Sequence, residues 1–192
     1  MSLIPAFEVG IWNAWIFMIW LLIQNYTIRL VSKEVYQKAG EPPNIEPNQG
    51  QKITGYISVI LWVLTTVYSI FLPFELGTVW FYIGLGIFLL GLIMTMVVTV
   101  NFTTTPINEP VTTGIYRYSR HPMYIAMILI YLSVAIASVS WIFLLASAIW
   151  LVLMRLGVAD EEKYCLWKYG EAYRKYMNRT PRWIGIPGSE RR

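Results

Sequence analysis

The stretch that decides the fold is the uncharged run "PMYIAMILIYLSVAIASVSWIFLLASAIWLVLM", residues 122–154. As a single helix it would be about 50 Å long, because an α-helix rises about 1.5 Å per residue. The hydrocarbon core of a bilayer is only about 30 Å thick, so one upright helix is too long for it. The residues "SVS" at 138–140 mark the place for a turn. We therefore expect two antiparallel membrane helices, residues 122–138 and 140–158.

Three further uncharged runs are long enough to cross a bilayer: Val9–Ile28, Ile53–Phe74 and Leu76–Asn101. The composition agrees, with 56% hydrophobic and only 14% charged residues, where a soluble domain has about 25% charged. We expect an all-α integral membrane protein, a single membrane domain over residues 1–192. Its five transmembrane helices are expected at 9–28, 54–73, 79–100, 122–138 and 140–158.

The basic residues predict how the chain is oriented. With five crossings, residues 29–52, 102–121 and 159–192 lie on one side, and they hold fourteen of the fifteen lysines and arginines. The remaining one, Arg155, ends the fifth membrane helix on that same side. Cytoplasmic segments carry the basic excess, so the N-terminus is expected outside and the C-terminus in the cytoplasm. A four-crossing path, with 122–158 as one helix, would put the basic C-terminus on the wrong side.

Several other classes of protein do not suit this sequence. The first apolar run lacks the basic start and the cleavage site of a signal peptide and is too long for one. The net charge of +4 suits membrane topology and contact with anionic membrane lipids, and no basic–aromatic stripe predicts nucleic-acid binding. Cys165 is the only cysteine, so we expect no disulfide and no metal cluster.

The polar segment "TTTPINEPVTTGIYRYSRHPMY", residues 103–124, leads into the fourth membrane helix. It carries Arg117, Arg120 and the only histidine, His121, directly before Pro122, which suits the first turn of a helix. Gly114 allows the backbone to approach a ligand closely. The segment is either a basic cap at the cytoplasmic edge or part of a site for an anionic or polar ligand.

A second polar segment, "DEEKYCLWKYGEAYRKYMNRTPRW" at 160–183, leaves the fifth membrane helix. Asp160 is expected as a helix N-cap, with Glu161 and Glu162 in the first turn, where the helix dipole favours acids. The helical spacing predicts a cytoplasmic amphipathic helix with one face formed by Glu162, Leu166, Tyr169, Tyr173 and Tyr176. The acidic pair either serves only this helix start or faces a cationic ligand.

The two polar segments are expected to lie side by side, because a tight turn at 138–140 makes the fourth and fifth membrane helices antiparallel neighbours. Residues 102–121 and 159–187 then form one site at the boundary between membrane and cytoplasm. Arginines, acids and tyrosines meet there without a metal-ligand set, a Ser–His–Asp arrangement or a phosphate-binding loop.

The same two segments resemble the superfamily of isoprenylcysteine carboxyl methyltransferases and phospholipid methyltransferases. That superfamily carries G-x-Y-x-x-x-R-H-P-x-Y before one membrane helix, as in "GIYRYSRHPMY" here, and an acidic pair with G-x-x-Y-x-x-Y after the next. The resemblance covers residues 111–187. It implies a methyltransferase that uses S-adenosylmethionine at the cytoplasmic face of the membrane, on a lipophilic acceptor or a small thiol, carboxylate or amine.

The resemblance also implies roles for single residues. Arg120 and Glu161 are the catalytic candidates, with Arg120 orienting the acceptor or holding its developing charge. Glu161 and Glu162 are implied to face the positively charged end of the cofactor, and Tyr173 to close the site. The implied lining of the cofactor pocket is Val111, Gly114, Tyr116, His121, Pro122 and Tyr124.

The sequence departs from the pattern at Ala126, where many members of the superfamily carry glycine. Two alternatives stay open. The C-terminal segment also resembles membrane sterol reductases, which bind NADPH, although those proteins carry asparagine at the position of Met123. A membrane protein without catalytic activity is the other alternative.

Overall fold

The computed structural model describes residues 7–31, 49–106 and 108–188. These residues form six α-helices and one short 3-10 helix, and no strand occurs among them. The helices are α1 (Trp15–Val31), α3 (Gln49–Ile70), α4 (Val79–Thr104), η1 (Gly114–Arg117), α5 (Pro122–Ala137), α6 (Trp141–Tyr169) and α7 (Glu171–Arg179). The fold is all-helical, as the composition predicts.

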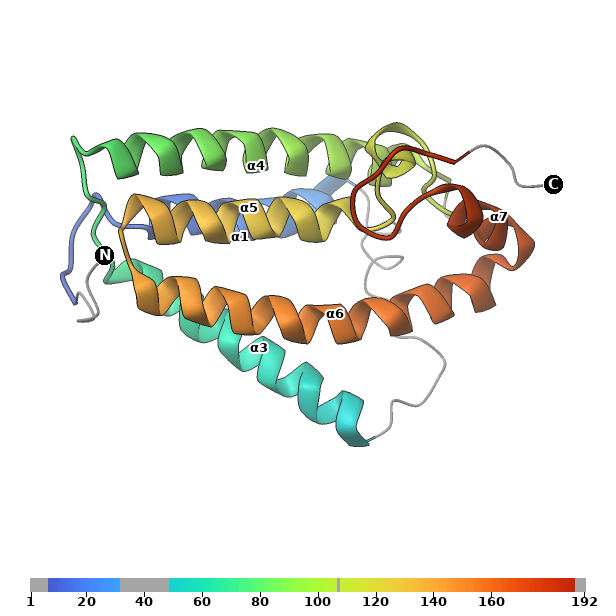
Figure 1. Ribbon diagram of the computed structural model, residues 1–192, viewed down its shortest axis with the longest axis horizontal. Coiled ribbons are helices and arrows are strands. Elements are labelled where there is room, and N and C mark those ends of the chain that lie inside the picture. Colours follow the sequence, from blue (N-terminus) through green and yellow to red (C-terminus); the bar gives the residue numbers. More distant parts are fainter. Residues whose placement is uncertain (1–6, 32–48, 107, 189–192) are drawn as a thin grey trace.

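Helices α1, α3, α4, α5 and α6 run along the molecule, and each runs opposite to the one before it (Figure 1). Three of them, α3, α4 and α6, are long and apolar enough to cross a membrane, and α5 is a shorter apolar helix. Many large apolar side chains on the long helices are exposed, among them Val59, Leu90 and Leu145. Such exposed apolar faces suit contact with lipid.

The helix predicted at 9–28 begins late and the helix predicted at 54–73 ends early, because residues 8–14 pack against residues 70–74. The Asn13 side chain donates to the carbonyls of Glu8 and Ile70, both at 2.7 Å. The Ala14 amide donates to the Leu72 carbonyl at 2.8 Å. These bonds hold both segments outside the helices. The helix predicted at 9–28 therefore begins only at Trp15, and the one predicted at 54–73 ends at Ile70.

The turn between α5 and α6 lies at Ser138–Ser140, the position that the sequence predicts. Val139 has a φ of 51°, a left-handed conformation that is rare for a β-branched residue. The serines on either side stabilise the turn. Ser138 Oγ donates to the Val134 carbonyl at 2.6 Å, and Ser140 Oγ accepts from the Phe143 amide at 3.2 Å.

Helix α4 approaches α5 closely at Gly84. A Cβ atom on Gly84 would lie 2.6 Å from the Ala137 Cβ and 2.7 Å from its nitrogen, so only glycine fits this contact. Ala126 is fully buried and its carbonyl faces α4 at Gly91. The departure from the superfamily pattern at Ala126 therefore lies in a contact between helices.

Helix α6 continues through the acidic residues, and the helix start predicted at Asp160 is wrong. Asp160 lies in the middle of α6, where its carboxylate accepts from Gln51 at 2.7 Å and from Lys163 at 3.0 Å. Acidic side chains with such partners are compatible with a helix interior. The last turns of α6, from Asp160 to Tyr169, carry all of its charged residues except Arg155 and extend past its apolar part.

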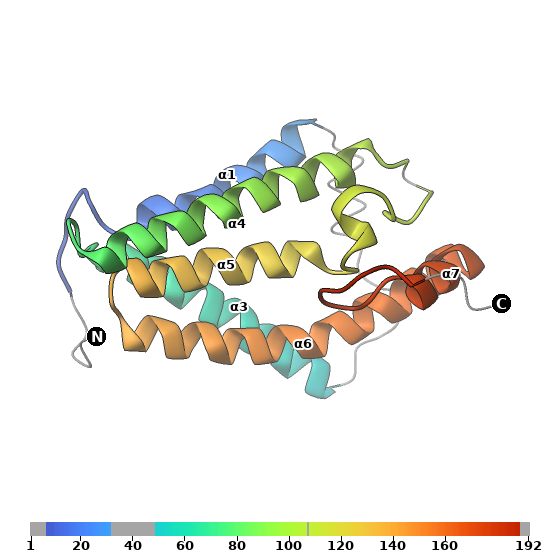
Figure 2. The same ribbon diagram turned by 45° about the horizontal axis from the view of Figure 1, so that its top comes forward.

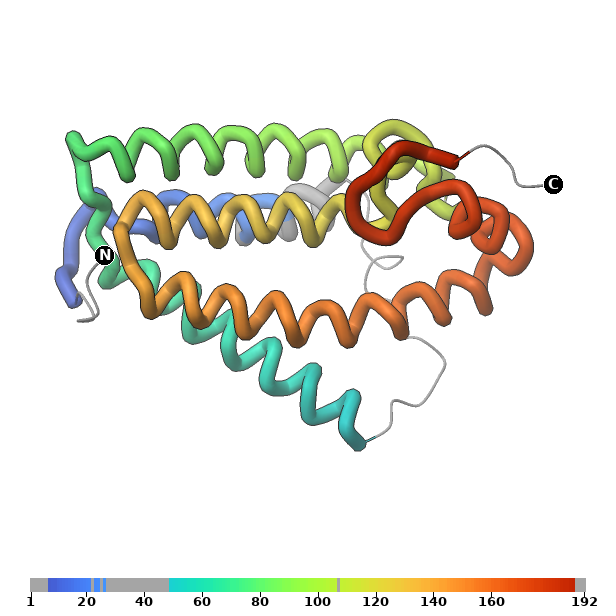
Figure 3. Tube along the Cα trace, viewed as in Figure 1, coloured from blue at the N-terminus to red at the C-terminus, as the bar shows by residue number. Residues whose placement is uncertain are grey.

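The predicted amphipathic helix is divided in two at Gly170, which has a φ of 55°. After this break α7 turns back toward η1 (Figure 2). Tyr173 and Tyr176 are the buried residues of α7, whereas Arg174 and Lys175 are exposed. The chain after α7 then loops toward the beginning of α5 before it turns away again (Figure 3). We call residues 180–188 the strap.

Candidate functional site

The segment before α5 is anchored on the end of α4. Gly114 has a φ of 61°, and a Cβ atom there would overlap the side chain of Asn101. Asn101 Oδ1 also accepts from the Ile115 amide at 3.2 Å. The sequence suggests that a ligand approaches Gly114 closely. In the structure the Asn101 side chain makes this close approach. Pro122 starts α5, and Val111 lies half-buried ahead of η1.

The strap packs against the residues that precede α5. The Arg120 amide donates to the Pro181 carbonyl at 3.0 Å, and the Gly185 amide donates to the Tyr118 carbonyl at 3.1 Å. Tyr176 of α7 donates from its hydroxyl to the Tyr116 carbonyl at 2.8 Å. The two polar segments are thus adjacent, and the strap lies against the first of them.

Glu162 is the centre of a buried cluster of charges. One oxygen, Oε1, lies 2.9 Å from Arg120 Nη2 and 3.2 Å from His121 Nε2. Arg182 of the strap donates to the same oxygen at 3.2 Å and to Oε2 at 2.5 Å. Glu162 is only 3% exposed. We call these four side chains the Glu162 cluster.

Two opposing effects set the pKa of the Glu162 carboxyl. Burial favours the neutral form, but hydrogen bonds from Arg182 and His121 and the charge of Arg120 outweigh it and lower the pKa below its ordinary value. Glu162 is therefore charged at neutral pH. Because both of its oxygens already have cationic or histidine partners, this carboxylate holds Arg120 and the strap in place.

Arg120 is fixed through this cluster. Its Nη1 donates to the Met177 carbonyl at 3.0 Å, and its side chain is only 10% exposed. Its Nε is a buried donor without a partner among the described residues. The guanidinium is thus held on two sides, by the Glu162 carboxylate and by the Met177 carbonyl.

Glu161 differs from its neighbour, because its side chain is 47% exposed. Its Oε2 accepts from the Tyr124 hydroxyl at 3.0 Å and lies 3.6 Å from His121 Nδ1. The two nitrogens of His121 thus face the two glutamates, one each. Of the acidic pair, Glu161 is the carboxylate that a cationic ligand can reach.

The buried tyrosines around this pair stay neutral. Burial and the nearby charge of Glu161 raise the pKa of Tyr116 well above its ordinary value, and burial does the same for Tyr173. Burial also raises the pKa of the Cys165 thiol, to about 12. These groups offer hydroxyl and thiol protons at neutral pH, and none of them is poised as a base or as a nucleophilic thiolate.

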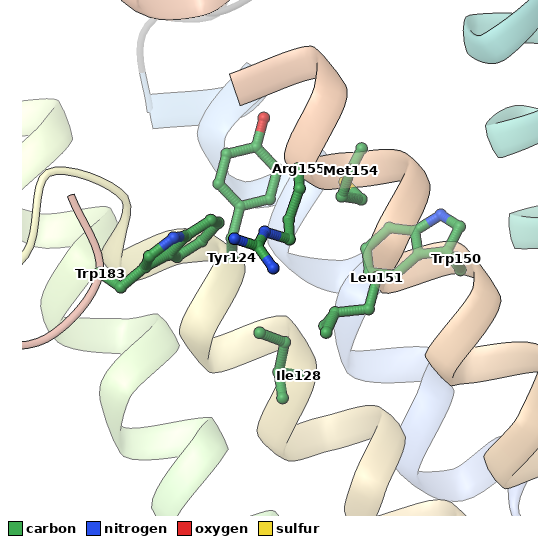
Figure 4. A pocket seen from close by; sticks show the side chains of 7 residues that line it. All are labelled: Tyr124, Ile128, Trp150, Leu151, Met154, Arg155 and Trp183. Atoms are coloured by element: carbon green, nitrogen blue, oxygen red, sulfur yellow. The ribbon is translucent and has the colours of Figure 1, made fainter. Parts of the chain in front are cut away.

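A groove of about 250 Å³ lies between α5 and α6 beside Glu161. Its walls are mainly apolar and aromatic, and Tyr124, Arg155 and Trp183 of the strap stand together at one end (Figure 4). The lining residues are Tyr124, Ile128, Trp150, Leu151, Met154, Arg155 and Trp183. Tyr124 belongs both to this groove and to the hydrogen bond with Glu161, so the groove and the charged site are continuous.

A second cavity, of about 500 Å³, lies between η1 and α7. It carries three basic residues, Arg117, Lys175 and Arg179, together with Thr112, Thr113 and Thr180. Arg117 of the first polar segment therefore faces this cavity and lies apart from the Glu162 cluster.

The structure brings together Arg120, His121, Tyr124, Glu161 and Glu162 from the sequence-predicted set. Sequence reasoning missed Arg182, Trp183 and the groove residues Trp150 and Arg155. In the sequence, Arg155 served only to predict the side of the membrane on which the fifth helix ends.

Among the described residues no group of three histidine, cysteine or acidic side chains is arranged to hold a metal ion.

Comparison with known families gives one match. Residues 53–172, more than half of the chain, match the family model described as phospholipid methyltransferase. The match contains η1, the R-H-P segment, both glutamates and the whole hairpin of α5 and α6. No curated protein and no solved structure matches the chain.

Proposed function

The chain belongs to the phospholipid methyltransferase family, and from this membership we propose that it transfers the methyl group of S-adenosylmethionine to an amphiphilic acceptor at the membrane surface. The family accounts for methyl transfer by a helical membrane protein. The cofactor, the acceptor and the side of the membrane are the parts that we add.

The observation that carries the proposal is the half-exposed carboxylate of Glu161 at the end of an apolar groove. Tyr124 donates to this carboxylate at 3.0 Å, and the aromatic rings of Tyr124 and Trp183 line the groove beside it. A carboxylate and aromatic faces are what a positively charged sulfur compound needs next to it. These residues therefore fit S-adenosylmethionine, which supplies a methyl group on a positively charged sulfur when bound.

The remaining residues position ligands and exclude water. Tyr124 orients the Glu161 carboxylate, and His121 lies between the two glutamates. The Glu162 cluster fixes Arg120, whose guanidinium would orient a polar group of the acceptor. Trp183 of the strap covers one end of the groove. Methyl transfer needs in-line approach and little acid–base help, so alignment and exclusion of water supply most of the rate.

We further propose that the chain crosses the membrane five times, with the N-terminus outside and the site facing the cytoplasm. The one-sided distribution of lysine and arginine supports this orientation. So does the antiparallel order of the five helices, which brings η1, α7 and the strap to one end (Figure 1).

A reductase that binds NADPH is the second candidate. The cavity between η1 and α7 favours it, because three basic residues there suit the phosphates of a nucleotide. The reductases carry asparagine where this chain has Met123. The Met123 side chain faces α1, and its sulfur accepts a hydrogen bond from the Gln24 side chain at 3.2 Å.

The thermal midpoint of the purified protein in detergent tests both candidates. S-adenosylmethionine or its demethylated product should raise the midpoint, because a ligand that binds only the folded state stabilises it. NADPH should leave it unchanged. The Glu161→Gln variant should lose most of the rise. Glu171→Gln is the matched control, because Glu171 is exposed and pairs with Arg174 on the surface of α7. A rise with NADPH alone would assign the protein to the reductases.

A further inference from the structure

Arg155 differs from Arg120, Arg174 and Arg182 at this end of the molecule. Arg120 and Arg182 are bound to Glu162, and Arg174 pairs with Glu171. In the part of the chain that the structure describes, the Arg155 guanidinium makes no ion pair and no hydrogen bond. Among the described residues that line the groove between α5 and α6, it is also the only cation.

The surroundings of Arg155 are apolar and aromatic. Figure 4 shows its guanidinium next to the Trp183 indole and the Tyr124 side chain. Deeper in the groove stand Ile128, Leu151 and Trp150. Ile128 is six residues into α5, or about 9 Å along that helix at about 1.5 Å per residue. The groove therefore runs from a cationic end into the apolar part of the helix pair.

An arginine at the cytoplasmic edge of a membrane helix is common, and such a side chain ordinarily reaches toward the lipid headgroups. Arg155 instead stands in a groove that continues to Tyr124 and Glu161. A lone cation at one end and apolar walls beyond it complement a molecule with an anionic head and a hydrocarbon chain. The planar guanidinium fork matches the oxygens of a phosphate.

Building on the proposed function, we propose that Arg155 recognises the acceptor by binding the phosphate of a membrane phospholipid whose hydrocarbon chain lies in the groove between α5 and α6. Atoms of the headgroup a few bonds from that phosphate then lie beside Tyr124 and Glu161. Arg155 is thus a specificity residue of the acceptor site, which adjoins the proposed cofactor site at Tyr124 and Trp183.

Binding of a matched pair of short-chain lipids in a neutral detergent tests this proposal. Dihexanoyl phosphatidic acid and dihexanoylglycerol have the same chains, and only the first carries a phosphate. Isothermal titration should show tighter binding of the phosphatidic acid to the parent protein. Arg155→Gln should weaken that binding about tenfold to a hundredfold, the usual effect of losing a hydrogen bond to a charged group. Arg155→Lys, which keeps the charge, should lose less.

The control variant is Arg117→Gln, which removes a cation from the cavity between η1 and α7. It should bind the phosphatidic acid like the parent. The proposal is overturned if Arg155→Gln binds that lipid unchanged, or if the loss occurs in Arg117→Gln instead. The thermal response to S-adenosylmethionine is measured on the same samples and should survive in Arg155→Gln. If the parent lacks that response, the cofactor assignment fails, while the lipid result still decides the role of Arg155.

Discussion

Replacing Glu162 by glutamine should destabilise the protein far more than the same change at Glu161. The amide keeps the shape of the side chain but removes the charge that Arg120 and Arg182 share. Arg120 and Glu162 are only 10% and 4% exposed, and removing one partner of such a buried pair costs about 3–5 kcal/mol. The Arg182 pair is 45% exposed on the arginine side, so we expect it to add no more than about 1 kcal/mol.

The assay is a thermal melt of each variant in the same detergent. A change of 1 kcal/mol shifts the Tm of a domain of this size by about 2–4 °C, so Glu162→Gln should lower the Tm by about 6–24 °C. Glu161→Gln removes a half-exposed carboxylate and should melt within a few degrees of the parent. If the two variants melt alike, Glu162 does not hold the strap and our assignment of the Glu162 cluster is wrong.

The stability of the protein should also depend on pH through Glu162. The folded-state pKa of Glu162 lies below its ordinary value of 4.5. Its contribution to stability is therefore complete above that ordinary value and is lost as the pH falls through the folded-state pKa. The parent protein should lose more stability than Glu162→Gln when the pH is lowered below about 4.5. Equal losses in both proteins would contradict the direction of this shift.

Two further predictions test the fold. In a variant without Cys165, a cysteine introduced at Thr78 should react with an impermeant reagent applied to intact cells, and one added after Arg192 should be shielded. The opposite labelling pattern would refute the proposed orientation. Gly84→Leu should separate α4 from α5, because its Cβ would lie 2.6 Å from that of Ala137. We expect a loss of a few kcal/mol from overpacking, seen as a lower Tm, whereas Gly86→Leu, with nothing within 4 Å, should melt like the parent.

Much of the fold follows from local signals in the sequence. The uncharged run at 122–154 contains its own turn, because serines at 138 and 140 can stabilise a reversal that the neighbouring apolar residues cannot. The helix start predicted at Asp160 is wrong, because a contact between distant parts of the sequence decides this position. An acidic residue suits a helix N-cap, but α6 keeps Asp160 inside the helix through contacts with Gln51 and Lys163, and Gln51 is far away in the sequence.

The candidate site also contains some residues that local sequence signals predict and others that only the folded structure brings to light. Pro122 and the R-H-P motif point to the first polar segment because their chemistry is local. Arg182 belongs to the strap, which has no periodic pattern, and its ion pair with Glu162 spans twenty residues. Trp183 and Arg155 become recognisable only when the strap and the two helices are in place. Sequence reasoning also treated Glu161 and Glu162 as a pair, and only their difference in burial separates their roles.

The strap has a consequence for how the protein becomes active during synthesis. Glu162 and Arg120 are translated and enter the folding protein before Arg182 and Trp183 exist, because a chain is made from its N-terminus. Until these last residues dock, Glu162 lacks its closest partner and the groove lacks one wall. The site is therefore completed by the last part of the chain, and a chain that ended before Arg182 would keep the sequence of every helix but leave the groove open on one side.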